Sequence, residues 1–457
     1  MDRRWEARLK GMLAECEVGP QMFHHAEERL QKFVVPFAEL LSQQAQREHA
    51  LEYVSGLVTD LERKNVESIA YRHDQERGKL QHFIGCAEWD HQPLLQELAH
   101  QVGTQVGEAD GVIVFDPSGF AKQGQKSVGV ARQWCGRLGK IENCQVAVYM
   151  AYVSRRERVL VNERLYLPTK WTQRRTRCKA AGVPKEVRFQ TRHALALEML
   201  AEQGHLLPHA WIAGDDEMGK KAAFRRELHE RGEQYLLAVP GNTLIRDLEV
   251  PPPEYQGRGR VPRQPFQRVD RWRDALPRSA WTSIEVRDGE KGPLEVEVVV
   301  RRVLTRLSRH LMPYEETLVI VRYRDGAGVT KYDFYLSDAP HTTPAKEFAR
   351  VALAAHRIEE AIKRGKSETG LSHYEVRNWR GWHHHQTLSL LATWFLVCET
   401  QRGKKIDPGH YLAPNSRRHR HASSCCLAVR HAEENCRSPT TPSGPQRASP
   451  ILSPQGT

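Results

Sequence analysis

Three acidic side chains stand where a metal-dependent phosphoryl-transfer site would place them. Asp116 and Asp215 each follow a short apolar run, and Glu359 lies in a helical pattern much later in the chain. Carboxylate oxygens are the ligands that Mg²⁺ prefers, and two such ions about 3.5–4 Å apart can activate a nucleophile and stabilise a leaving oxygen. Each acid alone is weak evidence, because surface carboxylates and helix N-caps account for most acids at strand ends. A two-ion carboxylate site is therefore a hypothesis at this point.

Alternating strands and helices are expected to position the two aspartates. Apolar and periodic patterns predict strands over 112–115, 145–154, 158–168, 210–214 and 235–240, and helices over 187–204 and 220–231. This alternation is typical of an α/β fold with a mixed sheet. The strands over 112–115 and 210–214 are expected to end directly in the acids, and α/β folds place their sites at the carboxyl ends of strands.

A basic segment and inserted strands precede Glu359. Residues 251–278 contain three consecutive prolines, seven arginines and three acids, a net charge of +4, and do not suit a central strand. Strand patterns then predict an antiparallel β insertion over 294–303, 317–323 and 331–336. Helices are expected over 345–366, which carries Glu359, and over 381–399.

The first hundred residues have helical patterns, with Asn65 as a predicted N-cap. Two interpretations stay open: a helical bundle packed on the rest, or a DNA-binding module such as a helix-turn-helix. For the whole chain we expect a helical, DNA-binding region over 1–105, the first part of the core over 106–245, a basic linker and β insertion over 246–344, C-terminal core helices over 345–402 and a disordered basic, proline-rich tail over 403–457.

Charge and hydropathy narrow the class of protein. The 457 residues include 68 Lys and Arg against 56 Asp and Glu, a formal net charge of +12, and nucleic acid is the most common anionic partner of such a protein. The longest apolar run, 388–398, is too short to span a bilayer, and no secretory signal is recognisable. Nine scattered cysteines without a CxxC pair indicate neither a disulfide framework nor a standard zinc module. We expect a cytoplasmic protein with no membrane partner.

Other residues have competing interpretations. The run His383-His384-His385 looks like a metal motif, but successive helical positions diverge by about 100°, so a solvated or phosphate-contacting face is favoured. Buried packing is favoured over base stacking for Trp272 and Trp281. The Cys and His residues from His419 onward match no common zinc spacing.

Four longer motifs connect these observations to a known family. They are Phe115-Asp-Pro-Ser-Gly-Phe-Ala-Lys-Gln-Gly, Ser127-Val-Gly-Val-Ala-Arg-Gln-Trp-Cys-Gly, Gly214-Asp-Asp-Glu-Met-Gly and Gly370-Leu-Ser-His-Tyr-Glu-Val-Arg-Asn-Trp-Arg-Gly-Trp. Over roughly residues 30–400 the sequence resembles the cut-and-paste insertion-sequence transposases of the DDE type, in the branch with a β-rich insertion between the second Asp and the Glu. The resemblance implies an α/β fold: an RNase H-like mixed-sheet core, an antiparallel β insertion and an N-terminal helical region.

The resemblance also implies which residues form the catalytic site. Asp116, Asp215 and Glu359 would be the catalytic triad and would hold two Mg²⁺ or Mn²⁺ ions. Asp216 and Glu360 are the register alternatives for the second and third acids.

Four basic residues are expected to bind DNA. Lys366 follows Glu359 by seven residues, which returns it to nearly the same helical face, so it could hold a DNA phosphate beside the metal site. Lys122, Arg377 and Arg380 lie within the family motifs.

The family pattern is not complete in this chain. Where the family expects Tyr and Arg, seven and four residues before the Glu, this chain has Ala352 and Ala355. These departures leave the metal ligands untouched but affect positions that contact DNA ends in the family.

The implied activity is cleavage of DNA at the transposon ends, after which the freed 3′-OH attacks target DNA. The implied partners are terminal inverted repeats, target DNA and a second copy of the chain, and the implied location is the nucleoid. Two other functions stay open: a catalytically impaired DNA-binding relic or regulator, and a host nuclease of RNase H-like fold.

Overall fold

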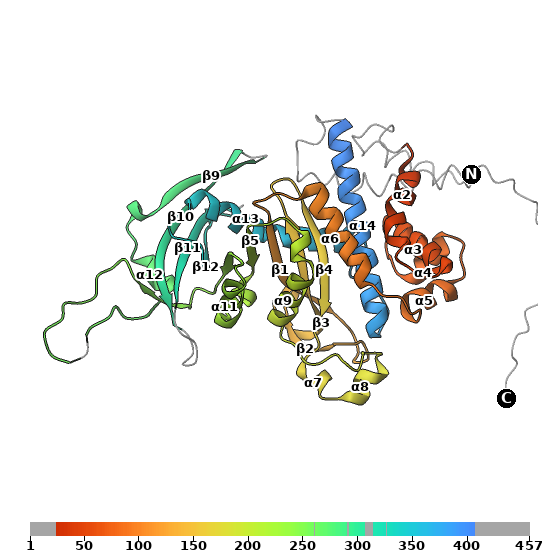
Figure 1. The fold of residues 1–457 in the computed structure, drawn as a ribbon, viewed down its shortest axis with the longest axis horizontal. Coiled ribbons are helices and arrows are strands. Elements are labelled where there is room, and N and C mark those ends of the chain that lie inside the picture. The colour runs from red at the N-terminus through yellow and green to blue at the C-terminus, as the bar shows by residue number, and fades with distance from the viewer. Residues whose placement is uncertain (1–23, 260, 290–291, 307–313, 326, 407–457) are drawn as a thin grey trace, which may run out of the picture.

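A mixed β-sheet runs through the middle of the molecule, with helices packed on it (Figure 1). The computed structural model describes residues 24–259, 261–289, 292–306, 314–325 and 327–406. Within these ranges the sheet has 12 strands. The helical pattern expected before residue 24 and nearly all of the predicted disordered tail lie outside the described residues.

Five strands form the RNase H-like core of this sheet, as predicted. They are β1 (Val112–Ala121), β3 (Lys140–Val153), β4 (Arg158–Leu165), β5 (Trp211–Gly214) and β6 (Tyr235–Ala238). Their order is β4-β3-β1-β5-β6; β3 runs antiparallel to both of its neighbours, whereas β5 and β6 run parallel to β1. Their side chains are almost all buried, because helices cover both faces of a sheet of this kind.

The first core strand is longer than predicted. The expectation that it ends at Asp116 is wrong, since β1 continues through Asp116-Pro-Ser-Gly to Ala121. It continues because β3 pairs with it as far as Ala121, whereas β5 pairs with it only as far as Phe115. Pro117 cannot donate to a sheet ladder, and it stands where one side of β1 has already lost its neighbour. The short strand β2 (Ala131–Cys135) adds a hairpin to the start of β3.

The predicted β insertion extends the core sheet from its β6 edge. The three expected strands appear as β10 (Gly292–Thr305), β11 (Glu315–Arg324) and β12 (Thr330–Ser337), and a further strand, β9 (Thr282–Gly289), pairs with β10. β12 pairs antiparallel with β6, so the insertion and the core form one continuous sheet. Figure 1 shows the insertion as the green and teal strands at one end of the molecule.

The basic segment before these strands contains little sheet. The strand β7 (Leu244–Asp247) precedes it, and the short elements β8 (Gln267–Arg268) and α12 (Val269–Asp274) lie within it. Trp272 is 6% exposed and packs in a buried cluster with Val269, and Trp281 packs against the same cluster, so the favoured prediction of buried packing is confirmed for Trp272.

Two long helices return the chain to the core. They are α13 (Ala345–Glu368) and α14 (Trp379–Ile406), close to the predicted ranges. α13 packs across β1, β4 and β5 and reaches β9 and β10 of the insertion, whereas α14 packs on β4 and on the N-terminal helices. The remaining helices of the core are α7 (Thr169–Thr172), α8 (Arg175–Ala180), α9 (Arg192–Gln203), α10 (Asp216–Gly219) and α11 (Ala222–Glu230).

The N-terminal region is helical, as expected, and packs around α14 (Figure 1). Its helices are α2 (Ala26–Ala38), α3 (Gln44–Leu57), α4 (Val66–Arg72), α5 (Arg77–Gly85) and α6 (Gln92–Val106). Asn65 caps α4, as predicted, because its side chain accepts a hydrogen bond from the Ser68 amide. None of the described helices is both long enough and apolar enough to cross a membrane.

This packing overturns the prediction for the histidine run. His383, His384 and His385 are 2%, 1% and 0% exposed, so the prediction of a solvated or phosphate-contacting face is wrong. The reason is that β4 lies on one side of this part of α14 and the N-terminal helices α3 and α5 lie on another.

Candidate active site

The register of two parallel strands brings Asp116 and Asp215 together. Phe115 of β1 pairs with Gly214 of β5, so the two aspartates are the next residues on adjacent strands. β5 ends there, and Asp215 becomes the N-cap of α10, where its Oδ1 accepts a hydrogen bond from the Met218 amide at 3.1 Å. Because the pairing of β1 with β5 ends at this point, both carboxylates lie at the same edge of the sheet.

Glu359 reaches the same place from α13. This helix packs on β1 and β5, and Glu359 lines a cavity of about 780 Å³ together with Asp116 and Asp215. The same three side chains also line an adjoining cavity of about 350 Å³. The structure thus gathers all three predicted acids, which the sequence separates widely, around one opening.

The electrostatics of the aspartates follow from this gathering. Burial and the nearby Glu359 raise the pKa of Asp116 to about 6, although Lys366 acts in the opposite direction. Burial and the charge of Asp116 raise the pKa of Asp215 to about 8. Like charges and low solvation both disfavour the ionised carboxylates, so a cation at this position would relieve the repulsion.

The two register alternatives differ from the predicted residues. Glu360 points away from the cavity and forms an ion pair with Arg158 of β4 at 2.9 Å. Asp216 is exposed at the cavity rim, one residue beyond the position next to Asp116. Asp215 and Glu359 are therefore the better candidates.

Lys366 lies over the same face of β1. Its Nζ donates to the Ser118 hydroxyl at 2.9 Å, stands 4.6 Å from the centre of the Phe120 ring, and lines the larger cavity. Asp116, Ser118 and Phe120 alternate along the strand and so share one side of it. The ammonium group is thus held beside the carboxylates, where a phosphate oxygen could reach it.

The other basic residues predicted to bind DNA are not gathered at this cavity. Lys122 donates to the Tyr374 carbonyl at 3.4 Å and lies over the Tyr374 ring, and its partial burial lowers its pKa to about 8. Arg377 is exposed beside a separate cavity of about 530 Å³. Arg380 donates to the Cys86 carbonyl at 2.6 Å and pairs with Glu88 at 3.0 Å. Their binding to DNA stays a prediction.

Two residues near the site were not predicted from the sequence. Trp134 of β2 is 56% exposed and lines the larger cavity. It lies in the second family motif, so that motif could have identified it. His356, one turn before Glu359, lines the smaller cavity, and its Nε2 lies 3.2 Å from Asp333 Oδ2. No local pattern marked His356, because its partner lies on β12.

The departures from the family pattern are accommodated in the helix. Ala352 is buried, and Ala355 lines the smaller cavity next to His356. The small side chain at 355 stands where the resemblance implies an arginine.

The donor set fits divalent cations that prefer oxygen. Three carboxylates suit Mg²⁺ or Mn²⁺, and two imidazoles are also close, since His373 lines the larger cavity and His356 the smaller one.

Parts of this chain are similar to known proteins. A probable transposase for the insertion sequence element IS701 from Microchaete diplosiphon is 36% identical over 96 residues, which are 20% of this chain and 25% of that protein. The chain therefore matches only a quarter of the length of this relative. A cryo-EM structure of the piggyBac transposase synaptic complex with hairpin DNA aligns with 93% of this chain and 83% of its own, at 11% identity and a TM-score of 0.39.

The family profile gives the broader match. The profile described as DDE superfamily endonuclease covers residues 36–293, more than half of the chain, including Asp116 and Asp215 but not Glu359. With the core strand order and the gathered acids, this match confirms the resemblance drawn from the motifs. The chain belongs to the DDE superfamily of endonucleases.

Proposed function

We propose that this protein is a DNA transposase that cuts transposon ends and joins them to target DNA by two-metal phosphoryl transfer. The observation that carries the proposal is the convergence of Asp116, Asp215 and Glu359 on one cavity from β1, β5 and α13. Three carboxylates alone would repel a DNA phosphate, so the proposed activity needs bound cations.

Each residue has a defined part in the proposed mechanism. Asp116 and Asp215 would hold one Mg²⁺ or Mn²⁺ ion, and Glu359 would hold the second. When bound, the two ions supply Lewis-acid neutralisation of the attacking and leaving oxygens. Lys366 would orient the scissile phosphate by a charged hydrogen bond in place of its contact with Ser118.

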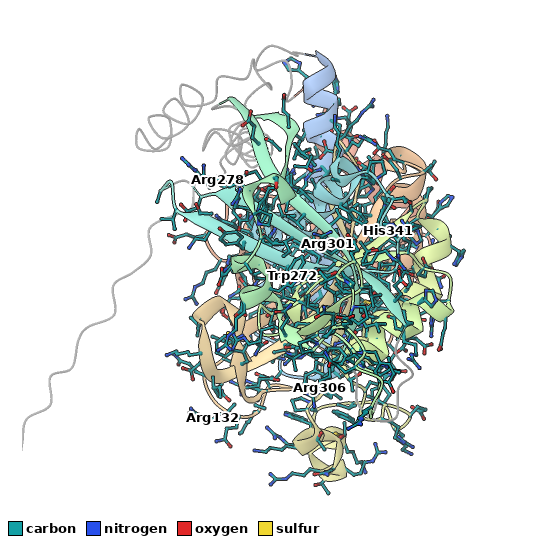
Figure 2. The ribbon with its side chains drawn as sticks, turned by 90° about the vertical axis from the view of Figure 1, so that its left-hand side faces the viewer. Arg132, Trp272, Arg278, Arg301, Arg306 and His341 are labelled. Atoms are coloured by element: carbon teal, nitrogen blue, oxygen red, sulfur yellow. The ribbon has the colours of Figure 1, made fainter. Side chains whose placement is uncertain are left out.

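The proposed partners are terminal inverted repeats, target DNA and a second copy of the chain that brings two ends together. Figure 2 shows Arg132, Arg278, Arg301 and Arg306 distributed over the face seen from the insertion end. Arg132, Arg278 and Arg306 are exposed and could neutralise DNA phosphates without reading bases, whereas Arg301 is half-buried and forms an ion pair with Glu249. Lys122, Arg377 and Arg380 remain proposed DNA contacts, and the proposed location is the cytoplasm, in association with the nucleoid.

A cleavage assay with neighbouring residues as matched controls tests the proposal. Purified protein is incubated with labelled terminal-repeat DNA and Mg²⁺ or Mn²⁺. Asp116→Asn, Asp215→Asn and Glu359→Gln are each expected to lower cleavage by at least about a hundredfold, because each removes a charge from the proposed metal site. Asp216→Asn and Glu360→Gln are expected to keep most of it.

The result that contradicts the assignment is equal loss in Glu359→Gln and Glu360→Gln, or cleavage that survives Asp116→Asn. Circular dichroism of each variant separates loss of chemistry from loss of fold.

A second candidate function is a DNA-binding relic or regulator with impaired catalysis, which Ala352 and Ala355 favour because the family expects Tyr and Arg there. Binding of terminal repeats without cleavage by the unaltered protein would support this function and refute the first. Cleavage without preference for terminal repeats would instead indicate a general nuclease.

A further inference from the structure

A second group of potential metal ligands lies outside the catalytic cavity. His91 precedes α6, Glu163 is on β4, and His383 is in the first turns of α14. One ligand atom from each lies within 4.8 Å of the other two. The group therefore joins the N-terminal helices, the core sheet and the last long helix at one point.

Two members of the group are buried polar side chains. Glu163 is 0% and His383 is 2% exposed; within the described residues neither ring nitrogen of His383 has a hydrogen-bond partner, and the Thr387 hydroxyl is a neighbour of the Glu163 carboxylate. His383 Nδ1 lies 3.4 Å from Glu163 Oε2. Buried polar groups are almost always satisfied, so an unsatisfied buried imidazole beside a buried carboxylate indicates an absent partner.

The surroundings hold the side chains in place. The His91 and His383 rings stack with their centres 4.6 Å apart, and the Trp379 and Trp382 rings pack on His383 at 4.5 and 4.7 Å. Gln92 Nε2 contacts His91 Nε2 at 3.1 Å on the edge of the same ring.

We propose that His91, Glu163 and His383 bind one divalent transition-metal ion, for which Zn²⁺ is the best match. Two imidazoles and one carboxylate form a known zinc ligand set, whereas Mg²⁺ prefers oxygen. With bonds of about 2.1 Å, tetrahedral ligands lie roughly 3.3 Å apart, so binding draws the three side chains inward. The ion fastens the N-terminal helices and α14 to β4.

An entry path and a place for a fourth ligand are present. His91 and His383 line a cavity of about 630 Å³, through which an ion and a water molecule can arrive. The nearest competing cation is Arg164, which is engaged by an ion pair with Glu202 and by a 2.6 Å hydrogen bond to Asn162 Oδ1. Its charge is therefore partly neutralised before an ion binds.

The proposed site is separate from the catalytic carboxylates. Asp116, Tyr149 and Glu163 pair in one row across β1, β3 and β4, so two strand spacings, about 10 Å, separate the acids. Among the described residues, the catalytic cavity and the cavity at His91 share no lining residue. The inference therefore does not depend on the proposed transposase activity.

Metal content tests the inference directly. The full chain carrying Asp116→Asn, which weakens the catalytic metal site, is incubated with Zn²⁺ in excess Mg²⁺, desalted and analysed by plasma mass spectrometry. One equivalent of zinc is expected, with less than about a tenth of it retained by the additional Glu163→Gln change, which keeps the shape of the side chain. Retention of zinc by Glu163→Gln, or its absence from the parent protein, would overturn the proposal.

A neighbouring histidine supplies the matched control. Both ring nitrogens of His384 already contact backbone carbonyls, of Ile84 and Trp89, at 3.0 Å, so His384→Gln is expected to keep the zinc. His91→Gln, at the partly exposed rim, replaces Glu163→Gln if the latter does not fold.

A second readout reports ligation rather than folding. Co²⁺ in place of Zn²⁺ is expected to give visible d–d absorption in the parent protein and none in the Glu163→Gln or His91→Gln variant. A chelator is expected to lower the unfolding temperature of the parent, with recovery on adding Zn²⁺. Absorption of equal strength in parent and variants would refute the ligand assignment.

Discussion

Single residues at the candidate active site act through charges held close together. Asp116 and Asp215 are ordinary aspartates placed side by side by strand register, and their raised pKa values follow from burial and from one another. The positive charge of Lys366 acts against the burial and the nearby negative charge, because it lowers the pKa of Asp116. Small changes in this set should therefore alter both metal affinity and DNA contact.

Lys366→Met tests the phosphate contact. The side chain keeps its length but loses its charge, so we expect DNA binding to weaken about tenfold and the slope of log affinity against log salt to fall by about 1. Titration of terminal-repeat DNA by fluorescence anisotropy at several salt concentrations measures both. Lys346→Met, an exposed lysine on the same helix outside the cavity, is the control, and an identical change in both variants would reject the contact.

Trp134→Ala tests whether an exposed aromatic ring supports the DNA at the cavity. Base–aromatic stacking contributes about 1–3 kcal/mol per base, so we expect cleavage of terminal-repeat DNA to fall by about tenfold or more. Trp134→Phe is expected to restore most of it, because an aromatic face remains. Full activity of the alanine variant in a single-turnover cleavage assay would show that the ring contacts no base.

Elements far apart in the sequence are joined by a buried ion pair. Arg225 of α11 donates to Glu316 of β11 at 2.7 and 3.2 Å, and the two side chains are 3% and 0% exposed. Tyr235 of β6 donates to the same carboxylate at 2.8 Å. The network fastens the β insertion to the core at the edge where β12 joins β6.

Breaking this pair on one side should destabilise the protein strongly. Glu316→Gln is expected to lower the free energy of unfolding by about 3–5 kcal/mol, because it leaves the Arg225 charge buried and unpaired. Denaturant unfolding followed by circular dichroism measures the loss. Glu315→Gln on the same strand breaks an exposed pair with Arg302 and is expected to change little; equal losses would show that burial is not the cause.

The whole molecule responds to pH through the carboxylates it gathers. The folded-state pKa values of Asp116 and Asp215, about 6 and about 8, lie above the ordinary value of 3.8. Folding therefore favours their protonated forms, and the associated stability is present below about pH 4 and is lost as the pH rises through 6 and then 8.

Metal-free protein should show this loss. Between about pH 5 and about pH 8.5 we expect Asp116 to lower the free energy of unfolding by about 1.5 kcal/mol, and Asp116→Asn to remove that part of the dependence. Denaturant unfolding at the two pH values, with and without Mg²⁺, measures it. Because Mg²⁺ compensates the repulsion, it should stabilise the unaltered protein most at the higher pH; a pH dependence unchanged by Asp116→Asn would contradict the linkage.

Much of this architecture could be predicted because its signals are local. Apolar stretches marked β3 and β4, a helical pattern marked α13, and Asn65 marked a helix start, since these signals depend on neighbouring residues. The motifs around Asp116 and Asp215 indicated the family, and the resemblance to that family identified Glu359 as the third acid.

What only the tertiary structure decided depends on contacts between distant segments. Strand register put Asp215 beside Asp116, and the pairing of β1 with β3 beyond Asp116 extended a strand that local sequence would end. Packing against β4 and the N-terminal helices buried His383, which its polarity alone would place in solvent, and set it against Glu163. The sequence by itself determined the elements and the family, because periodicity and motifs are written along the chain; which side chains meet was decided by the fold, because burial and register are properties of segments brought together.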